Sequence, residues 1–219
     1  MIEMKISDID LMWLGHSGFL IKNNKIIYID PYDISGGEKA DIILITHPHY
    51  DHCSIADIEK IIKDGTIVVC PADCQSKIAK LDKGIELRTI DVGETIELDN
   101  GIAVGGIPAY NTNKPNHPKS ERWLGYLLKI NGNSIYHAGD TDLIPEMKKL
   151  TGKVQVALLP VGGSVTMNVQ EAAQAAALIK PSLVLPMHYG SIVGSVRDAE
   201  IFKKLCVGQG IKAEILEKE

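Results

Sequence analysis

The segment from Thr46 to His52, THPHYDH, holds three histidines and one aspartate within six residues of a chain that has seven histidines in 219 residues. Imidazole nitrogens and carboxylate oxygens are ligands that divalent metals such as zinc prefer. In an extended loop, His47, His49 and Asp51 project the same way, and His52 faces elsewhere, toward a second metal. A histidine-rich surface loop is the less favoured alternative, so the segment predicts a metal site.

Regular elements on both sides position this segment. The apolar run at residues 42–45 predicts a strand, and Ser54 with Asp57 three residues later resembles a capping box that opens a helix closed by Gly65. Loops at the carboxyl edge of strands are where α/β proteins place ligands. Similar short β-branched runs predict further strands at residues 26–29, 66–69 and 86–90.

The second half of the sequence combines hairpins with a crossover. LDNG at 98–101 and INGN at 130–133 predict two hairpin turns. Asn168 and Glu171 open an alanine-rich helix that ends before Pro181. The apolar runs VALLPVG and SLVLPMHYG flank this helix as strands, so the whole pattern predicts mixed sheets covered by helices.

Length and composition set outer limits. A chain of 219 residues with 45% hydrophobic residues predicts one domain, residues 1–219, with a full core. A net charge of −5 argues against a nucleic-acid partner. We see no signal peptide and no apolar run near the ~18 residues of a membrane span, so a cytoplasmic protein is expected. Four free thiols are then expected, at Cys53, Cys70, Cys74 and Cys206.

At this point the sequence resembles a known family. His47-Pro-His49-Tyr-Asp51-His52 matches the HxHxDH signature of the metallo-β-lactamase superfamily. YHAGDT at 136–141 is similar to the family's GDT segment, and PMHYG at 186–190 to its final histidine segment. WLGHSGF at 13–19 and YIDP at 28–31 resemble the branch of ascorbate-6-phosphate lactonases and N-acyl-phosphatidylethanolamine phospholipase D-like proteins. The resemblance covers essentially the whole chain and implies an α/β (α+β) fold, the four-layer αββα sandwich.

The resemblance also implies a ligand set for two divalent metal ions. Zn2+ is expected, and Mn2+, Fe2+ or Ni2+ suits the same ligands. The first ion would be held by His47, His49 and His117, and the second by Asp51, His52 and His188, with Asp140 as the bridging carboxylate. Asp51, Asp140 and His188 are carried over as catalytic residues.

The third histidine ligand is the open point. His117 lies in the long loop NTNKPNHPKSER at 111–122, whereas related branches place this ligand directly after a strand, in a segment resembling Ala109-Tyr110-Asn111. Either His117 reaches in from the loop, or the first metal site is incomplete with Asn111 in place of the ligand. His16 and His137 are expected to form hydrogen bonds near the site rather than to bind metal.

The implied chemistry is hydrolysis by a metal-activated hydroxide. Tyr110 and Tyr189 are candidate hydrogen-bond donors to the reacting oxygen. The loop cations Lys114, Lys119 and Arg122 could pair with an anionic group, or could be a solvated surface. We therefore expect a small anionic ester, lactone or phosphodiester as substrate.

Three other functions stay open from the sequence. A nucleic-acid phosphodiesterase needs a basic clamp or a large insertion, and neither is seen. A di-iron oxidoreductase of this fold would have Glu in place of His49. A metal-poor, non-catalytic member of the fold is favoured only by Asn111. Cys53, beside His52, is read as a small apolar residue rather than a soft ligand. The oligomeric state is left open.

Overall fold

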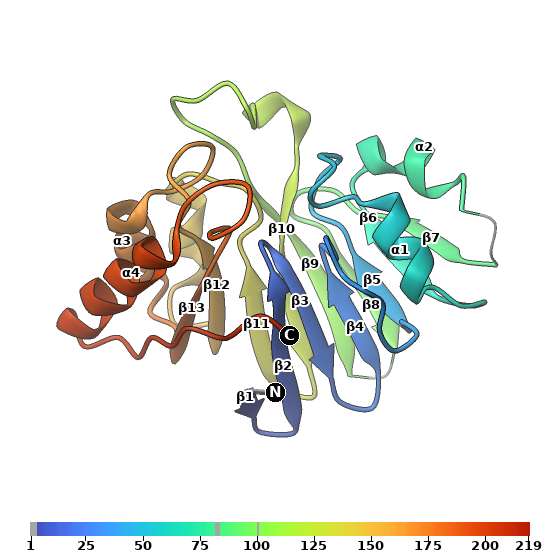
Figure 1. Cartoon of the computed structure of the whole chain (residues 1–219), viewed down its shortest axis with the longest axis horizontal. Coiled ribbons are helices and arrows are strands. Elements are labelled where there is room, and N and C mark those ends of the chain that lie inside the picture. The colour runs from blue at the N-terminus through green and yellow to red at the C-terminus, as the bar shows by residue number, and fades with distance from the viewer. Residues whose placement is uncertain (1–3, 82–83, 100) are drawn as a thin grey trace. The chain divides into compact units, whose positions relative to one another are not determined.

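The computed structural model describes residues 4–81, 84–99 and 101–219, and these fall into two compact units (Figure 1). The N-terminal unit comprises the residues up to Asp91 together with Leu216–Glu219, and the C-terminal unit is Val92–Ile215. Each unit contains one sheet and its own helices. That residues 1–219 act as one domain stays a prediction.

The sheet of the N-terminal unit has seven strands in chain order. They are β1 (Met4–Ile6), β2 (Ile9–Gly15), β3 (Gly18–Lys22), β4 (Ile26–Ile29), β5 (Ile42–Leu44), β6 (Ile67–Cys70) and β7 (Glu86–Thr89). Pairing is antiparallel from β1 to β4 and parallel from β4 to β7. The carboxyl ends of β4, β5 and β6 therefore meet at one edge. The four predicted strands are confirmed to within one residue at each end.

Short helices pack on this sheet. They are α1 (Ile55–Ile61), the 3₁₀ helix η1 (Ala72–Cys74) and α2 (Gln75–Ile78), and α1 and α2 lie beside β5, β6 and β7 in Figure 1. Ile58 and Ile61 of α1 share a buried cluster with Ile43 of β5 and Val68 of β6. Cys53, Cys70 and Cys74 join the same cluster. All four cysteines, Cys206 of the C-terminal unit included, are buried free thiols, as expected.

The predicted capping box at Ser54 is wrong. The Ser54 side chain makes no cap to the helix backbone, and α1 ends at Ile61, before Gly65. Instead, the Ser54 hydroxyl donates to Asp57 Oδ2 at 2.6 Å. The same carboxylate accepts the backbone N–H groups of Asp33 at 2.9 Å and Ile34 at 3.3 Å. Asp57 thus links the loop at Asp33 and Ile34 to α1 and does not cap the first turn of α1.

The sheet of the C-terminal unit has six strands in the order β13-β12-β11-β10-β9-β8. They are β8 (Thr95–Asp99), β9 (Ile102–Pro108), β10 (Leu124–Ile130), β11 (Asn133–His137), β12 (Val156–Pro160) and β13 (Leu183–Met187). The hairpins β8–β9 and β10–β11 are confirmed, although Asn100 of the first turn lies outside the described residues. β11, β12 and β13 are parallel, so their carboxyl ends share one edge.

Helices α3 (Val169–Ile179) and α4 (Val196–Gly208) lie beside β12 and β13 (Figure 1). The predicted capping box of α3 is confirmed: Asn168 Oδ1 accepts the N–H groups of Gln170 and Glu171, and Glu171 accepts the N–H of Asn168. The 3₁₀ helices η2 (Lys119–Glu121) and η3 (Pro145–Leu150) complete the unit. None of the helices in the described ranges combines the length and apolarity needed to cross a membrane.

Candidate metal centre

The THPHYDH segment is anchored by a buried aspartate on the neighbouring strand. Asp30 follows β4 and Thr46 follows β5, and these parallel strands pair directly. Asp30 Oδ1 accepts the Thr46 backbone N–H at 2.8 Å, and Oδ2 accepts the Thr46 hydroxyl at 2.6 Å. His52 Nδ1 lies 2.7 Å from the same Oδ2. Neither Asp30 nor Thr46 was singled out from the sequence as a supporting residue.

These contacts set the tautomers of two histidines. An ionised carboxylate only accepts hydrogen bonds, so His52 Nδ1 carries the proton and Nε2 presents a lone pair. Thr46 donates its hydroxyl proton to Asp30, so its oxygen accepts from His47 Nδ1 at 3.0 Å. His47 Nε2 then presents a lone pair as well. Both rings are buried, and their centroids lie 4.0 Å apart with the ring planes tilted by 44°.

His47 and His49 point nitrogen atoms at a common position. His47 Nε2 and His49 Nδ1 are 3.0 Å apart. Two nitrogens on one tetrahedral zinc ion, with bonds of about 2.0–2.1 Å, would be separated by roughly 3.3 Å. The pair therefore fits one divalent ion.

The expected extended loop does not continue past His49. The His49 carbonyl accepts the N–H groups of His52 at 3.1 Å and Cys53 at 2.8 Å, which closes a turn. This turn brings the His52 ring back against His47. Strict alternation along the segment is therefore wrong from Asp51 onward.

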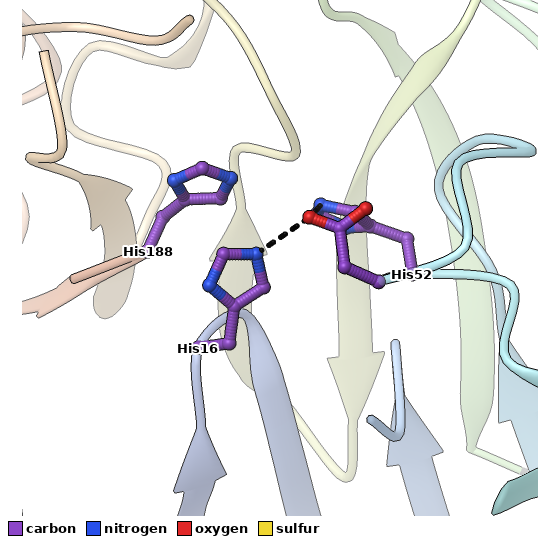
Figure 2. Close-up of side chains that lie close together, drawn as sticks. His16, His52 and His188 are labelled. Carbon is purple, nitrogen blue, oxygen red and sulfur yellow. Dashed lines mark hydrogen bonds and ion pairs between the residues drawn. The ribbon is translucent and has the colours of Figure 1, made fainter. Parts of the chain in front are cut away.

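Asp51 is held by His16. His16 Nε2 lies 3.0 Å from Asp51 Oδ2, the contact dashed in Figure 2. His16 occupies the turn between β2 and β3, with a left-handed φ of +50°, and its carbonyl accepts the Trp13 indole N–H at 2.9 Å. Asp51 Oδ2 is also 3.8 Å from His52 Nε2. The expected hydrogen-bonding role of His16 is confirmed.

The C-terminal unit gathers the other three predicted ligands. Asp140 follows β11 and His188 follows β13, at the shared carboxyl edge of the parallel strands. Asp140 Oδ2 lies 3.0 Å from His188 Nε2 and 3.3 Å from His117 Nε2, and all three side chains are buried. One carboxylate oxygen near two imidazole nitrogens is the arrangement that the bridging role of Asp140 requires. Figure 2 shows the ring of His188 at the end of its strand.

Gly139 permits the turn that delivers Asp140. Its φ is +64°, a region that glycine enters without strain. A Cβ at this position would lie 2.4 Å from the Leu124 carbonyl oxygen, which belongs to β10. A side chain at residue 139 would therefore force Asp140 away from the strand edge.

Asn111, the alternative to His117 in the sequence, is in direct contact with His117. Asn111 Oδ1 accepts the His117 backbone N–H at 3.0 Å and lies 3.1 Å from His117 Nδ1. The carbonyl of Val165 lies 3.2 Å from the same Nδ1. Both neighbours of Nδ1 are acceptors, so Nδ1 is protonated and Nε2, which faces Asp140, presents its lone pair.

Asp142 organises the rest of this loop, and its role was missed from the sequence. Its carboxylate accepts the Thr112 N–H at 2.8 Å and the Asn111 amide at 3.1 Å, and it forms an ion pair with Lys114. Partial burial opposes ionisation, but these bonds, with Lys114 foremost, lower the pKa of Asp142. The Lys114 ammonium is therefore paired with the Asp142 carboxylate. A single Asp outside any motif gives no sequence pattern that would have revealed the role of Asp142.

The structure also places four further residues that were singled out from the sequence. Tyr110 donates its hydroxyl to Glu146 at 2.8 Å, and burial raises the pKa of Tyr189 to about 12. His137 Nδ1 accepts the Gly139 N–H at 3.2 Å, the hydrogen-bonding role expected for it. Cys53 is part of the apolar core, in line with its reading as a packing residue.

Comparison with known proteins places the chain in one family. Residues 10–188 match the family described as the Beta-lactamase superfamily domain. A UPF0173 metal-dependent hydrolase of Pyrococcus abyssi is 38% identical, over 95% of this chain and 96% of that one. A crystal structure from Parabacteroides distasonis has a TM-score of 0.86 and 31% identity, over 99% and 98% of the two chains. Igni18, a metallo hydrolase from Ignicoccus hospitalis, has a TM-score of 0.80 and 26% identity, over 96% and 95%.

The chain therefore belongs to the metallo-β-lactamase superfamily. It is a metal-dependent hydrolase, the name that its UPF0173 relatives also carry. Two mixed sheets with flanking helices, together with these neighbours, confirm the α/β sandwich class. The narrower resemblance to ascorbate-6-phosphate lactonases stays a prediction.

Proposed function

We propose that this protein hydrolyses a small anionic ester, lactone or phosphodiester. One observation carries the proposal: in each unit, ligand atoms of buried or half-buried histidines and aspartates lie 3.0–3.3 Å from one another. Neutral histidines and carboxylates at that spacing are what a divalent ion needs. The supporting acceptors, Asp30 and Asn111, fix which nitrogen of His52 and His117 is presented.

We propose two ions, with Zn2+ as the expected metal. The proposed ligands are His47, His49 and His117 for one ion, Asp51, His52 and His188 for the other, and Asp140 for both. The assignment follows the family signature, and the lone-pair directions within each unit support it. When bound, such ions lower the pKa of a water molecule and polarise the bond to be cleaved.

The chain's own residues contribute position and charge. Asp140 provides a buried carboxylate between His117 and His188, and Asp51 is oriented by His16. Fixed donors and acceptors of this kind need no rearrangement during the reaction. No serine, cysteine or lysine nucleophile is required.

Elemental analysis of the purified protein tests this proposal. We expect about two metal equivalents per chain in the parent and about one in His117→Ala and His49→Ala, which remove ligands of the same ion. Asp140→Ala should lose both ions, and His49→Ala and Asp140→Ala should lose hydrolysis. Asn116→Ala, an exposed neighbour of His117, is the matched control and should keep both ions. A parent that holds no metal, or that hydrolyses esters equally well after chelation, contradicts the proposal.

A further inference from the structure

A cavity of about 300 Å³ lies inside the C-terminal unit, apart from the ligand cluster itself. Its walls come from the end of β9, from η2 and the residues after it, and from η3. The apolar lining includes Val92, Ile107, Pro108, Trp123 and Leu150. This volume is at the small end of pockets that bind organic ligands.

The charged groups of this pocket are mostly cationic. Lys119, Arg122 and Lys149 line it together with one carboxylate, Glu146, which gives a formal charge of +2 (three minus one) in a chain of net charge −5. Lys119 is committed to Glu146, since its ammonium lies 2.9 Å from Glu146 Oε1 and 3.1 Å from the Tyr110 hydroxyl. Within the described residues, Lys149 makes no ion pair.

Arg122 is held in an uncommon conformation at this wall. It ends η2 with a left-handed φ of +57° and ψ of +31°. A residue in the left-handed region is a common end for a helix. Arg122 and the next residue, Trp123, both line the pocket.

The pocket shares residues with the candidate metal centre. The Trp123 ring packs edge-on against His117, with centroids 5.6 Å apart. The Tyr110 N–H donates to the Thr141 hydroxyl, next to Asp140, at 3.2 Å. A ligand in the pocket therefore lies one side chain away from His117.

We propose that this pocket binds a carboxylate-bearing, otherwise apolar part of the substrate, with Lys149 facing the carboxylate and Arg122 in the same wall. The substrate class is thus a small ester or lactone of an aliphatic or aromatic acid that carries a free carboxylate, and this assignment rests on the proposed function. A phosphate fits less well because the walls offer mainly apolar groups beside these cations. Trp123 and Leu150 would contact the apolar body.

Titration with simple probes tests the pocket without turnover. The chain has two tryptophans, so the indole N–H signals of Trp13 and Trp123 in a ¹H–¹⁵N NMR spectrum of the Zn2+-loaded protein can be assigned with Trp123→Phe. We expect phenylacetate to shift the Trp123 signal saturably and to leave that of Trp13 unchanged. Phenylacetamide, its neutral isostere, should bind about tenfold more weakly.

Variants that remove one charge test whether the charged groups of the pocket contribute to phenylacetate binding. Lys149→Gln should weaken phenylacetate binding about three- to fivefold, the size of a partly exposed ion pair, without changing phenylacetamide binding. Lys148→Gln, an exposed neighbour outside the pocket lining, is the matched control. Glu146→Gln removes the pocket's carboxylate and should strengthen phenylacetate binding.

Several results would overturn the inference. Equal affinity for phenylacetate and phenylacetamide, or a Trp123 signal that neither probe moves, contradicts an anion-binding pocket. Tighter binding of phenyl phosphate than of phenylacetate contradicts the carboxylate assignment. A protein that binds two metals and hydrolyses esters but fails these titrations contradicts only the pocket. A protein that binds phenylacetate as described but takes up no metal contradicts only the proposed function.

Discussion

Individual side chains around the ligands determine which ring nitrogen each histidine presents. Asp30 fixes His52, the Thr46 hydroxyl fixes His47, and Asn111 fixes His117. Such supporting bonds commonly contribute 10–100-fold to metal affinity. The structure therefore gives Asn111 a positioning role in a place where the sequence alone left it as a competitor of His117.

Replacement of Asn111 by Ala should impair one metal site. The variant removes the acceptor of the His117 N–H groups and a donor to Asp142, so we expect about 10–100-fold weaker binding of one of two ions. A competition titration with a chromophoric chelator measures the affinity. Asn113→Ala, an exposed change in the same loop, should leave both affinities unchanged. Equal affinities in the two variants would mean that Asn111 does not position His117.

The candidate ligand residues could be proposed from the sequence because histidines and aspartates recur at family spacings. The residues that hydrogen-bond to these candidates could not be predicted in this way. Asp30 acts on Thr46 and His52 only because β4 and β5 pair in parallel and end together. Asp142 is one acidic residue among 28, without a pattern of its own. Supporting residues emerge from strand pairing rather than from spacing along the chain.

At the scale of elements, the β-branched runs and the Asn168–Glu171 cap predicted strands and a helix correctly. The cap at Ser54 failed because the Asp57 carboxylate is taken by backbone N–H groups 23 and 24 residues away. Local sequence cannot reveal a distant competitor for the same side chain. The buried Asp57 therefore stabilises a tertiary contact between α1 and the loop after β4.

Asp57→Asn should destabilise the fold in a pH-dependent way. Burial opposes ionisation, but hydrogen bonds from Lys60, Ser54 and backbone N–H groups lower the pKa of Asp57 in the folded state. Its contribution is thus complete above the pKa of an unfolded Asp, about 3.9, and is lost as the pH falls through the folded pKa. We expect a loss of about 1–3 kcal/mol at pH 7.

Urea unfolding of parent and variant at pH 7 and pH 3 measures this difference. The gap in unfolding free energy should narrow at the lower pH, since the parent then loses the ionised Asp57. Glu59→Gln, on the exposed side of the same helix, is the control and should stay within about 0.5 kcal/mol of the parent. A gap that stays constant between the two pH values would show that the charge of Asp57 contributes nothing.

At the scale of the whole molecule, the motif spacing predicted the superfamily and the α/β sandwich class. The pocket beside Trp123 was beyond prediction, because its lining comes from four segments between residues 92 and 150 that meet only in the folded unit. The proposed ligand residues also come from both units, with His47, His49, Asp51 and His52 in one, and His117, Asp140 and His188 in the other.

Metal removal should lower the thermal stability of the whole chain. Ligands that bind only the folded state stabilise it, by about 2.7 kcal/mol when the free ligand is 100-fold above its Kd. For a chain of this length that corresponds to a Tm change of roughly 5–10 °C. Differential scanning calorimetry with and without EDTA measures it. Asp140→Ala should show a much smaller effect of EDTA, and a parent Tm that ignores EDTA would contradict metal binding by the folded chain.

Backbone strain at His16, Asp30 and His188, with φ of +50°, +44° and +59°, bears on protein engineering. Glycine enters this region freely, so a design method that considers only backbone strain would choose glycine at these three positions. Each such exchange would also delete a proposed ligand or its support, and at Asp30 it would remove the buried acceptor of the Thr46 hydrogen bonds. A thermostable version of this enzyme is therefore best designed with these three positions held fixed.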